Sequence, residues 1–329
     1  MKFILNIPKI IPILLMVTTF TLSCSNDDDN TPPQELSIVE TALATPDLSS
    51  LVAALQAADG DLISVINSGT FTVLAPTNAA FSAFLTANGF ASLDDVPTDV
   101  LATILLNHVI TGEVASATLV NSGAGYTETN ATNADGDNIS LYYNTTGGVT
   151  FNGVSTVTTA DVSASNGIVH IVDAVIGLPT VVTFATADPT FSTLVAALTR
   201  DDLTFDYVTT LSTPAGTSPA PFTVFAPTND AFGDLLTELN ATSLDDIDEP
   251  TLKATLDHHA VAAANVRAED LSQGQVVGTL GGDITISLDA GPQITDANDR
   301  VSNIIATNVQ AMNGVIHAID KVILPPLGE

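Results

Sequence analysis

The 329-residue sequence contains one cysteine, no tryptophan and only seven Lys and Arg residues. A single cysteine excludes an internal disulfide framework and any metal site built from several thiolates. Seven cations against 37 Asp and Glu give a formal net charge of −30, which excludes the clustered positive charge that nucleic acid binding requires. The same imbalance disfavours docking on anionic lipids. With aromatic residues at 5%, platforms for stacking bases or sugar rings are scarce.

Hydrophobic residues make up 45% of the chain, enough for packed cores, and the length is about twice that of a typical domain. The charges are distributed unevenly, because residues 36–179 contain 13 acids and no Lys or Arg. Ion pairs within that region are therefore excluded as a source of stability. Apolar burial and backbone hydrogen bonds must stabilise it instead.

The N-terminus is typical of a processing segment. Lys2 and Lys9 precede an apolar run over residues 10–20, which is too short to span a bilayer, since a membrane helix needs about 20 residues. Soon after the run comes the only cysteine, Cys24. This arrangement resembles the lipobox of bacterial lipoproteins, although Thr21 stands where that family usually has leucine. An ordinary secreted protein with an incidental cysteine is the alternative.

The lipobox resemblance implies that residues 1–23 are a signal peptide, that Cys24 is acylated and that the lipid holds the protein in the outer membrane. Residues 24–35 are acidic and proline-containing, and they predict a solvated linker. The linker also resembles the acidic tags of lipoproteins that reach the outer face of the outer membrane. A cell-surface location is therefore predicted, with the periplasmic face as the alternative.

The chain contains an internal repeat. Residues 71–81 (FTVLAPTNAAF) recur as residues 222–232 (FTVFAPTNDAF), and residues 166–173 (NGIVHIVD) recur as residues 313–320 (NGVIHAID). A period near 145 residues is too long for a solenoid unit. The sequence therefore predicts two duplicated domains.

We expect the domains at residues 36–179 and 181–325. The offset between the copies grows from 143, at the LVAAL segments that begin at Leu51 and Leu194, to 151 at the FTV segments. The difference predicts an eight-residue insertion in the second copy, near residues 209–221, where Ser, Thr, Pro and Gly accumulate.

Each copy has helical patterns early and strand patterns late. Leu48, Leu51 and Leu55 have the spacing of one helix face, and Thr77 is suited to cap a second helix. Residues 71–74 predict a short strand that Pro76 ends. The order favours an α+β fold over an alternating βαβ fold. Turn signals in the later region predict β-hairpins at Asp135-Gly136, Gly147-Gly148, Asn152-Gly153 and Gly281-Gly282.

A further helix is predicted after Pro97, with Leu101, Ile104, Leu105 and His108 on one face. This helix, the FTV-x-APTN-x-AF phrase and the closing NG-x-x-H segment together resemble the fasciclin-like domain, in both copies and in the same order. The resemblance implies two tandem domains, each a wedge or sandwich of β-strands backed by short helices. It also implies secreted or surface-anchored proteins that mediate adhesion or matrix contact.

In the fasciclin-like family, adhesion is associated with a Tyr–His pair at the end of the mid-domain helix. The corresponding pairs here are Asn107-His108 and His258-His259, so the histidine is kept and the tyrosine is missing. These four residues are the candidate binding residues. The alternative is structural, because His108 continues an apolar helical stripe and His170 lies within an apolar strand. Such histidines usually bond the backbone.

No catalytic, cofactor-binding or metal-binding constellation is predicted. The sequence contains no nucleophile elbow, phosphate-binding loop or paired metal-ligand spacing. Asp135-Gly136-Asp137 is interpreted as a hairpin tip, with weak calcium binding as the alternative.

These patterns predict a non-enzymatic cell-surface adhesion or binding protein, anchored by lipid at Cys24, whose tandem domains contact a matrix, glycan or protein partner. The partner is a surface protein or polysaccharide, nucleic acid is excluded, and the membrane is contacted only through the lipid. A periplasm-facing structural or glycan-associated lipoprotein of the envelope is the alternative function.

Overall fold

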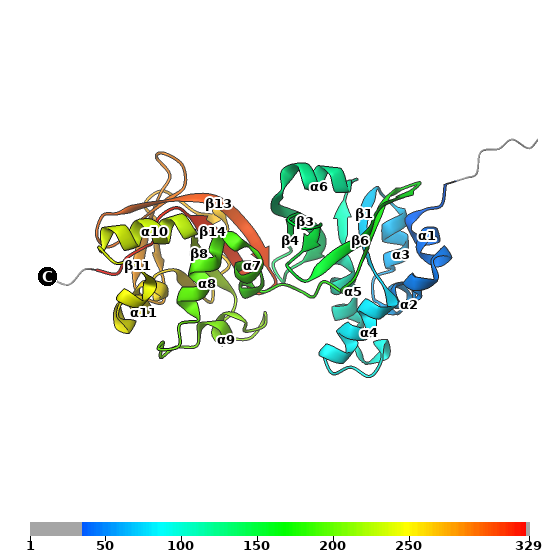
Figure 1. Cartoon of the computed structure of the whole chain (residues 1–329), viewed down its shortest axis with the longest axis horizontal. Helices are drawn as coiled ribbons and strands as arrows, with labels where there is room; N and C mark the ends of the chain where they lie inside the picture. The colour runs from blue at the N-terminus through cyan, green and yellow to red at the C-terminus, as the bar shows by residue number, and fades with distance from the viewer. Residues whose placement is uncertain (1–34, 327–329) are drawn as a thin grey trace, which may run out of the picture. The chain divides into compact units, whose positions relative to one another are not determined.

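The structure is a computed structural model that describes residues 35–326 (Figure 1). These residues group into one compact unit by their contacts. The predicted signal peptide, Cys24 and residues 24–34 of the predicted linker lie outside the described residues, so their predictions remain untested.

The first copy contains six α-helices, seven strands and two 3-10 turns. The helices are α1 (Ile38–Ala44), α2 (Ser49–Ala57), α3 (Leu62–Asn67), α4 (Asn78–Ala87), α5 (Thr98–Leu106) and α6 (Ser116–Ser122). The strands are β1 (Phe71–Pro76), β2 (Val109–Thr111), β3 (Ala124–Thr132), β4 (Asn138–Asn144), β5 (Thr150–Phe151), β6 (Ser155–Ala164) and β7 (Gly167–Val172). The 3-10 turns η1 (Pro46–Leu48) and η2 (Leu93–Asp95) precede α2 and α5.

The second copy repeats this order with small differences. Its helices are α7 (Val181–Ala187), α8 (Ser192–Leu198), α9 (Tyr207–Leu211), α10 (Asn229–Glu238) and α11 (Glu249–Asp257). Its strands are β8 (Phe222–Pro227), β9 (Ala260–Ala262), β10 (Val276–Gly278), β11 (Asp283–Ser287), β12 (Gln293–Thr295), β13 (Val301–Ala311) and β14 (Gly314–Ile319). Its 3-10 turns are η3 (Pro189–Phe191), η4 (Leu244–Asp246) and η5 (Ala268–Asp270), and η5 occupies the place of α6.

The two sheets have the same topology. The strand order is β2-β1-β7-β6-β5-β4-β3 in the first and β9-β8-β14-β13-β12-β11-β10 in the second. All neighbouring strands are antiparallel except β1 with β7 and β8 with β14. The early strand of each copy thus pairs in parallel with the last strand of the same copy. The predicted α+β fold, with helices backing the strands, is confirmed.

The local signals of the sequence appear as predicted. Leu48, Leu51 and Leu55 are buried on the inner side of η1 and α2. Thr77 accepts a hydrogen bond from the Ala80 amide at 3.2 Å and so caps α4, and Thr228 caps α10 in the same way. The four predicted glycine turns all join antiparallel strands, namely β3 to β4, β4 to β5, β5 to β6 and β10 to β11.

Two expected boundaries need correction. Strand β1 extends to Pro76, because proline takes the last ladder position and the next amide, of Thr77, donates to Val172 instead. Helix α5 ends at Leu106, so His108 follows the helix by two residues and does not belong to it. The predicted insertion near residues 209–221 agrees with the structure, because ten residues separate α9 from β8 whereas three separate α3 from β1.

Each copy contains two buried apolar clusters. In the first copy, one cluster joins the helices to β1 and β7 and includes Leu51 and Phe81. The other gathers Leu74, Leu141 and Phe151 from the sheet. The second copy has the same division. The first copy also contributes Tyr142 to the helix-side cluster of the second copy.

Side chains of the first copy also bond to residues of the second. The Tyr126 hydroxyl donates to Asp188 Oδ2 at 2.9 Å, and its ring packs edge-on against Phe184. The Ser140 hydroxyl accepts from the Gln310 amide at 2.9 Å. Burial of these groups indicates that the copies share part of their packing within the compact unit.

No single helix within residues 35–326 is long and apolar enough to cross a membrane. Two bent helix pairs satisfy the length and composition criteria together, Ile38–Ala44 with Pro46–Ala57 and Val181–Ala187 with Pro189–Leu198. Their breaks bend by 108° and 93°, and they bury Leu51 and Leu194 in the domain cores. We therefore interpret both pairs as core helices.

Candidate functional site

The two histidines at the ends of the mid-domain helices bind backbone groups in the interior. His108 Nδ1 lies 2.8 Å from the Ile104 carbonyl oxygen, and Nε2 accepts from the Ile176 amide at 2.9 Å. His259 repeats both contacts with Thr255 and Ile323, at 2.8 and 3.0 Å. Each ring therefore carries its proton on Nδ1 and joins the helix end to the segment after the last strand.

Their neighbours in sequence are equally enclosed. Asn107 donates to the Gly177 carbonyl at 3.1 Å and accepts from the Thr129 hydroxyl at 3.2 Å. His258 Nδ1 lies 2.8 Å from the Ala254 carbonyl oxygen, and a Cβ on Gly281 would lie only 2.2 Å from the same nitrogen. The exposed fractions of the four candidate binding residues are 0% for Asn107, 2% for His108, 2% for His258 and 3% for His259. A partner on the folded surface does not reach these side chains.

Burial also controls the protonation of His108 and His259. Desolvation lowers the pKa of His108 to about 4, against a smaller opposite effect of the bond to Ile104. Desolvation likewise lowers the pKa of His259 to about 4. Both rings are neutral at pH 7, as their acceptor bonds from backbone amides require.

The histidines of the closing strands have the same kind of role. His170 Nε2 donates to the Val114 carbonyl at 2.9 Å, and Nδ1 accepts from the Asp161 amide at 3.1 Å. His317 donates to Val266 at 2.9 Å. The structural interpretation of His108 and His170 therefore agrees with their surroundings.

The Asn-Gly pair of each closing segment joins three parts of its domain. Asn166 accepts from the Ile38 amide at 2.8 Å and donates to the Ile66 carbonyl at 2.9 Å. Gly167 has φ +142°, and a Cβ there would lie 1.8 Å from the Phe71 carbonyl oxygen. Only glycine allows this close approach of β7 to β1. Asn313 and Gly314 repeat the arrangement, with a Cβ distance of 2.1 Å to Phe222.

Two further polar residues in the repeated phrase were missed by the sequence reasoning. The buried Thr72 hydroxyl donates to Gly112 and accepts from Val114, both at 2.8 Å. Asn78 accepts from the Ser50 amide and donates to the Pro46 carbonyl. Thr223 and Asn229 make the equivalent bonds in the second copy. The recurrence of this Thr and this Asn at equivalent positions of both copies was the sequence signal that could have identified them.

The carboxylates do not converge on a metal. Among the described residues, no group of three or more His, Cys, Asp or Glu side chains could hold an ion. Asp135 and Asp137 lie at the β3–β4 hairpin, and Asp137 pairs with Arg267. The predicted hairpin tip is thus confirmed, and one of its two carboxylates already has a cation as partner.

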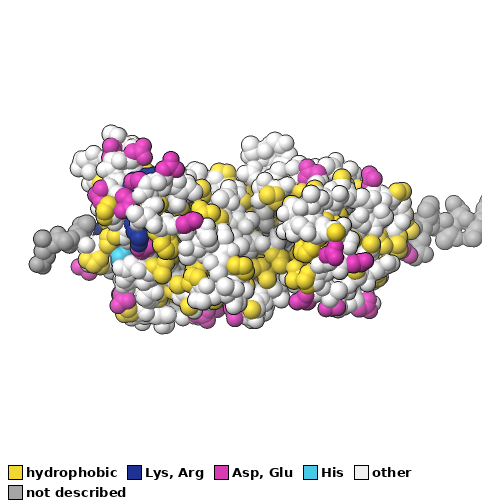
Figure 2. Space-filling model, turned by 90° about the horizontal axis from the view of Figure 1, so that it is seen from below, with side chains coloured by type: hydrophobic (Ala, Val, Ile, Leu, Met, Phe, Trp, Pro, Cys, Tyr) yellow, Lys and Arg dark blue, Asp and Glu magenta, His cyan; other side chains and the backbone are white. Residues whose placement is uncertain are grey.

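The surface is dominated by acidic and uncharged side chains. Acids are scattered over the face that Figure 2 shows, and the basic side chains on this face lie on the second copy. The five cations of the described region, Arg200, Lys253, Arg267, Arg300 and Lys321, each pair with a carboxylate. The repeated polar residues thus serve the interior, and the surface presents few free cations to a partner.

Two α+β domains with the same sheet topology, each joined internally by equivalent Thr, Asn and His side chains, define a tandem-repeat protein. The family model of the fasciclin domain matches residues 46–179 and 189–325. The chain belongs to the fasciclin-domain family, which confirms the prediction of two tandem fasciclin-like domains.

The chain is similar to several known proteins. It is 37% identical to protein sll1483 of Synechocystis sp. over 150 residues, 45% of this chain and 74% of that protein. It is 30% identical to the transforming growth factor-beta-induced protein ig-h3 of Sus scrofa over 263 residues, 78% of this chain and 35% of that protein.

Among solved structures, the chain resembles a FAS1 domain pair from the insect cell adhesion molecule Fasciclin I. The TM-score is 0.51 at 22% identity, with 86% of this chain and 97% of that chain covered. This likeness concerns the fold, and it extends over both domains.

Proposed function

We propose that the protein is a non-enzymatic cell-surface adhesion or binding protein, anchored by lipid at Cys24. The observation that supports this most strongly is the tandem pair of fasciclin domains whose repeated polar residues are all occupied by internal bonds. Histidines held in this way are not available for acid–base catalysis. A binding role through the outer surface agrees with the solved relative, which comes from a cell adhesion molecule.

The charge of the surface restricts the partner. Residues 24–329 contain 37 acids and five Lys or Arg, a formal net charge of −32. An anionic partner is repelled by such a surface, whereas a neutral or cationic one is not. A neutral polysaccharide or a basic surface protein is therefore the proposed partner, and nucleic acid is not.

A bead assay tests the adhesive function. Beads coated with residues 24–329 are allowed to settle on surfaces bearing a neutral polysaccharide, a basic protein or an anionic polysaccharide, with albumin-coated beads as control. We expect retention on a neutral or basic surface and none on the anionic one at 0.1 M NaCl, where the Debye length is about 10 Å. Retention equal to that of albumin on every surface would contradict the proposal.

The location is tested separately on cells. Replacing Cys24 with Ala should move the protein from the membrane fraction to the soluble fraction. Protease added to intact cells should remove the unaltered protein if it faces outward. Complete protection in intact cells, with digestion after lysis, would instead support the periplasm-facing structural or glycan-associated lipoprotein.

A further inference from the structure

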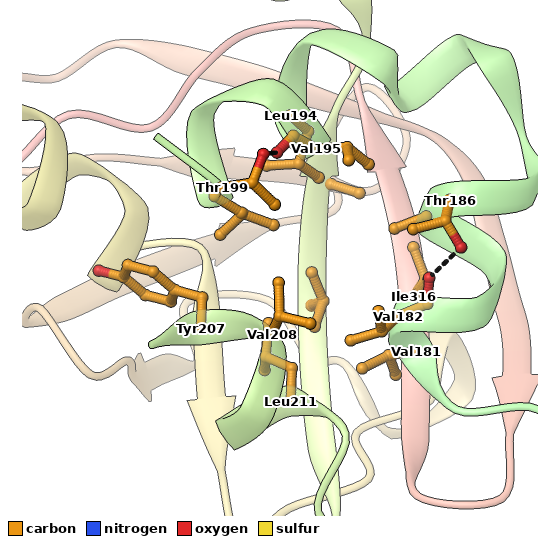
Figure 3. A pocket seen from close by; sticks show the side chains of 14 residues that line it. Val181, Val182, Thr186, Leu194, Val195, Thr199, Tyr207, Val208, Leu211 and Ile316 are labelled. Carbon is orange, nitrogen blue, oxygen red and sulfur yellow. Dashed lines mark hydrogen bonds between the residues drawn. The ribbon is translucent and has the colours of Figure 1, made fainter. Parts of the chain in front are cut away.

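The second domain contains an apolar pocket of about 150 Å³ (Figure 3). Its walls are three short helices, with Val181 on α7, Leu194 on α8 and Leu211 on α9. Its floor is the parallel strand pair, with Val224 on β8 and Ile316 on β14. The sequence reasoning did not anticipate this pocket.

The pocket opens to solvent between the helices. Thr186, Thr199 and Val208 line it and are exposed, whereas the wall and floor residues Val181, Leu194 and Ile316 are buried. A molecule from solution therefore reaches the aliphatic interior without unfolding of the sheet.

The side-chain hydroxyls at this pocket donate hydrogen bonds to other residues of the protein. The hydroxyl of Thr186 donates to the Val182 carbonyl at 2.9 Å, and that of Thr199 donates to the Val195 carbonyl at 2.8 Å (Figure 3). The Tyr207 hydroxyl donates to Asp257 Oδ1 at 2.6 Å. No described residue that lines the pocket is charged, so the pocket offers a ligand neither a charge nor a free hydroxyl hydrogen.

The first domain provides an internal comparison. At the same place, between α1, α2, α3 and the β1–β7 pair, its cavity measures only about 20 Å³. Ile38, Leu51, Ile66 and Val73 line this cavity at the positions of Val181, Leu194, Leu211 and Val224. The larger space is thus not a general consequence of the fold, since an equivalent set of residues nearly fills it in the first copy.

We propose that the second-domain pocket binds an uncharged small molecule through a short alkyl chain. A pocket of about 150 Å³ lined by aliphatic side chains has room for a molecule of about six carbon atoms. An empty cavity leaves its lining atoms without contact partners, which a hydrocarbon supplies. The aliphatic lining favours an alkyl chain, and the hydroxyl groups at the pocket already donate their hydrogens to other residues.

The charge around the pocket selects an uncharged head group. Residues 181–329 carry 20 acids and five cations, and a carboxylate ligand is repelled by that excess. Arg200, which follows Thr199 at the mouth, bonds Asp202 and the carbonyls of Leu244 and Ile247. It is therefore not free to pair with an anionic head group.

Alcohol titrations of the full two-domain chain test the proposal. The probes are 1-butanol, 1-pentanol and 1-hexanol, and the readout is the methyl NMR signals of Val181, Leu194 and Leu211. We expect these signals to shift and Kd to fall about fourfold with each added methylene. Hexanoate at pH 7 should shift them at least tenfold less at equal concentration. Absence of shifts with 1-hexanol, or equal shifts with hexanoate, would overturn the proposal.

Substitutions localise the binding. Val195→Phe places an aromatic ring at the pocket from α8, and we expect it to weaken 1-hexanol binding at least tenfold. The matched control is Val52→Phe at the equivalent position of α2, which should leave Kd unchanged. Ala185→Leu fills the pocket from α7 and serves if Val195→Phe does not fold. Unchanged Kd in a folded pocket variant, or equal loss in Val52→Phe, would overturn the assignment.

Vesicles distinguish a free molecule from a bilayer acyl chain. A pocket for about six carbons is too small to extract a membrane lipid, so phosphatidylcholine vesicles should leave the Val181, Leu194 and Leu211 signals in place. Shifts with vesicles but none with 1-hexanol would show that the source is a lipid and would refute the proposed ligand.

Discussion

Residues 36–179 carry 13 acids and no Lys or Arg, whereas residues 181–329 carry 20 acids and five cations. Both regions form seven-stranded sheets with the same strand order and the same parallel pair. Ion pairs within a domain are therefore not required for this topology. The shared features are polar side chains that bond the backbone, with Thr72, Asn78, His108, Asn166 and His170 in the first domain.

The helix layers of the two domains differ more than their sheets. The loop from α3 to β1 has three residues and that from α9 to β8 has ten, and the cavity beneath measures about 20 Å³ in one domain and 150 Å³ in the other. Equivalent hydrogen bonds from polar side chains to the backbone thus give the two domains the same sheet topology. The packing of the short helices differs between the domains. Substitutions at equivalent positions can test this comparison.

The largest effect is expected at the close approach of the parallel strands. Gly167→Ala places a Cβ 1.8 Å from the Phe71 carbonyl oxygen, and Gly314→Ala places one 2.1 Å from the Phe222 carbonyl oxygen. Neither oxygen can move without breaking the ladder, so each variant should lose more than about 4 kcal/mol of unfolding free energy. Urea unfolding measures the loss.

Gly136→Ala is the control for backbone conformation alone. Gly136 has φ +90° but nothing within 4 Å of its added Cβ. We expect a cost of about 1–2 kcal/mol, the penalty of a left-handed conformation. Equal losses in Gly136→Ala and Gly167→Ala would show that the strand contact is not limiting.

The next effect concerns pH and should be alike in the two domains. Burial lowers the pKa of His108 and of His259 to about 4, whereas the unfolded value is 6.5. The unfolded chain therefore takes up protons that the folded chain does not. The stabilisation is complete above pH 6.5 and is lost as pH falls towards 4, by up to about 3 kcal/mol for each histidine.

Stability measured by urea between pH 4 and 7 checks this effect. His108→Gln and His259→Gln should each reduce proton uptake on unfolding at pH 5 by about one. Hydrogen bonds from Ser116 lower the pKa of the Asp161 carboxyl from its ordinary value of 3.8. Protonation of this carboxyl therefore destabilises the folded state only below about pH 3.8. An unchanged slope in both variants would contradict neutral, buried histidines.

A smaller loss is expected from the buried threonines. Thr72→Val and Thr223→Val keep the shape but leave one backbone carbonyl and one amide without partners in each domain. Each should cost about 1–3 kcal/mol, and the two costs should agree closely. Urea unfolding of both variants decides, and a large loss in one domain with none in the other would refute equivalent roles.

The smallest effect is the response to salt, where the domains should differ. Raising NaCl from 0.1 to 1 M shortens the Debye length from about 10 to 3 Å and weakens repulsion among carboxylates. The first domain has no cations of its own whose ion pairs would weaken as well. Hydrogen exchange in the full chain should therefore slow more in β7 than in β14. No change in β7 would indicate that bound cations already neutralise these carboxylates.

Much of the fold could be predicted because it rests on local signals. The spacing of Leu48, Leu51 and Leu55 and the cap at Thr77 involve residues within one or two helical turns of one another. The parallel pairing of β1 with β7 was not predicted, because it joins Phe71 to Gly167, nearly a hundred residues away. No local pattern specifies such a partner.

The candidate site was predicted less well. Asn107, His108, His258 and His259 were the candidate binding residues, but their burial, which depends on segments such as Ile176 and Gly281 far along the chain, was not foreseen. The repeated Thr72 and Asn78 were available as a signal. Their acceptors, Gly112 and Pro46, could not be identified before the chain was folded.

The sequence by itself determined the duplication, the α+β order, the acidic excess and the positions of helix caps and turns. These properties depend on composition, on periodicity and on residues close together in the chain. Tertiary structure alone decided which strands pair in parallel, that His108 and His259 are neutral and enclosed, and that one domain keeps a pocket where the other is filled. The physical reason is that burial and cavity volume depend on how distant segments pack, and a difference of a few methylene groups or loop residues changes that packing without changing the local pattern.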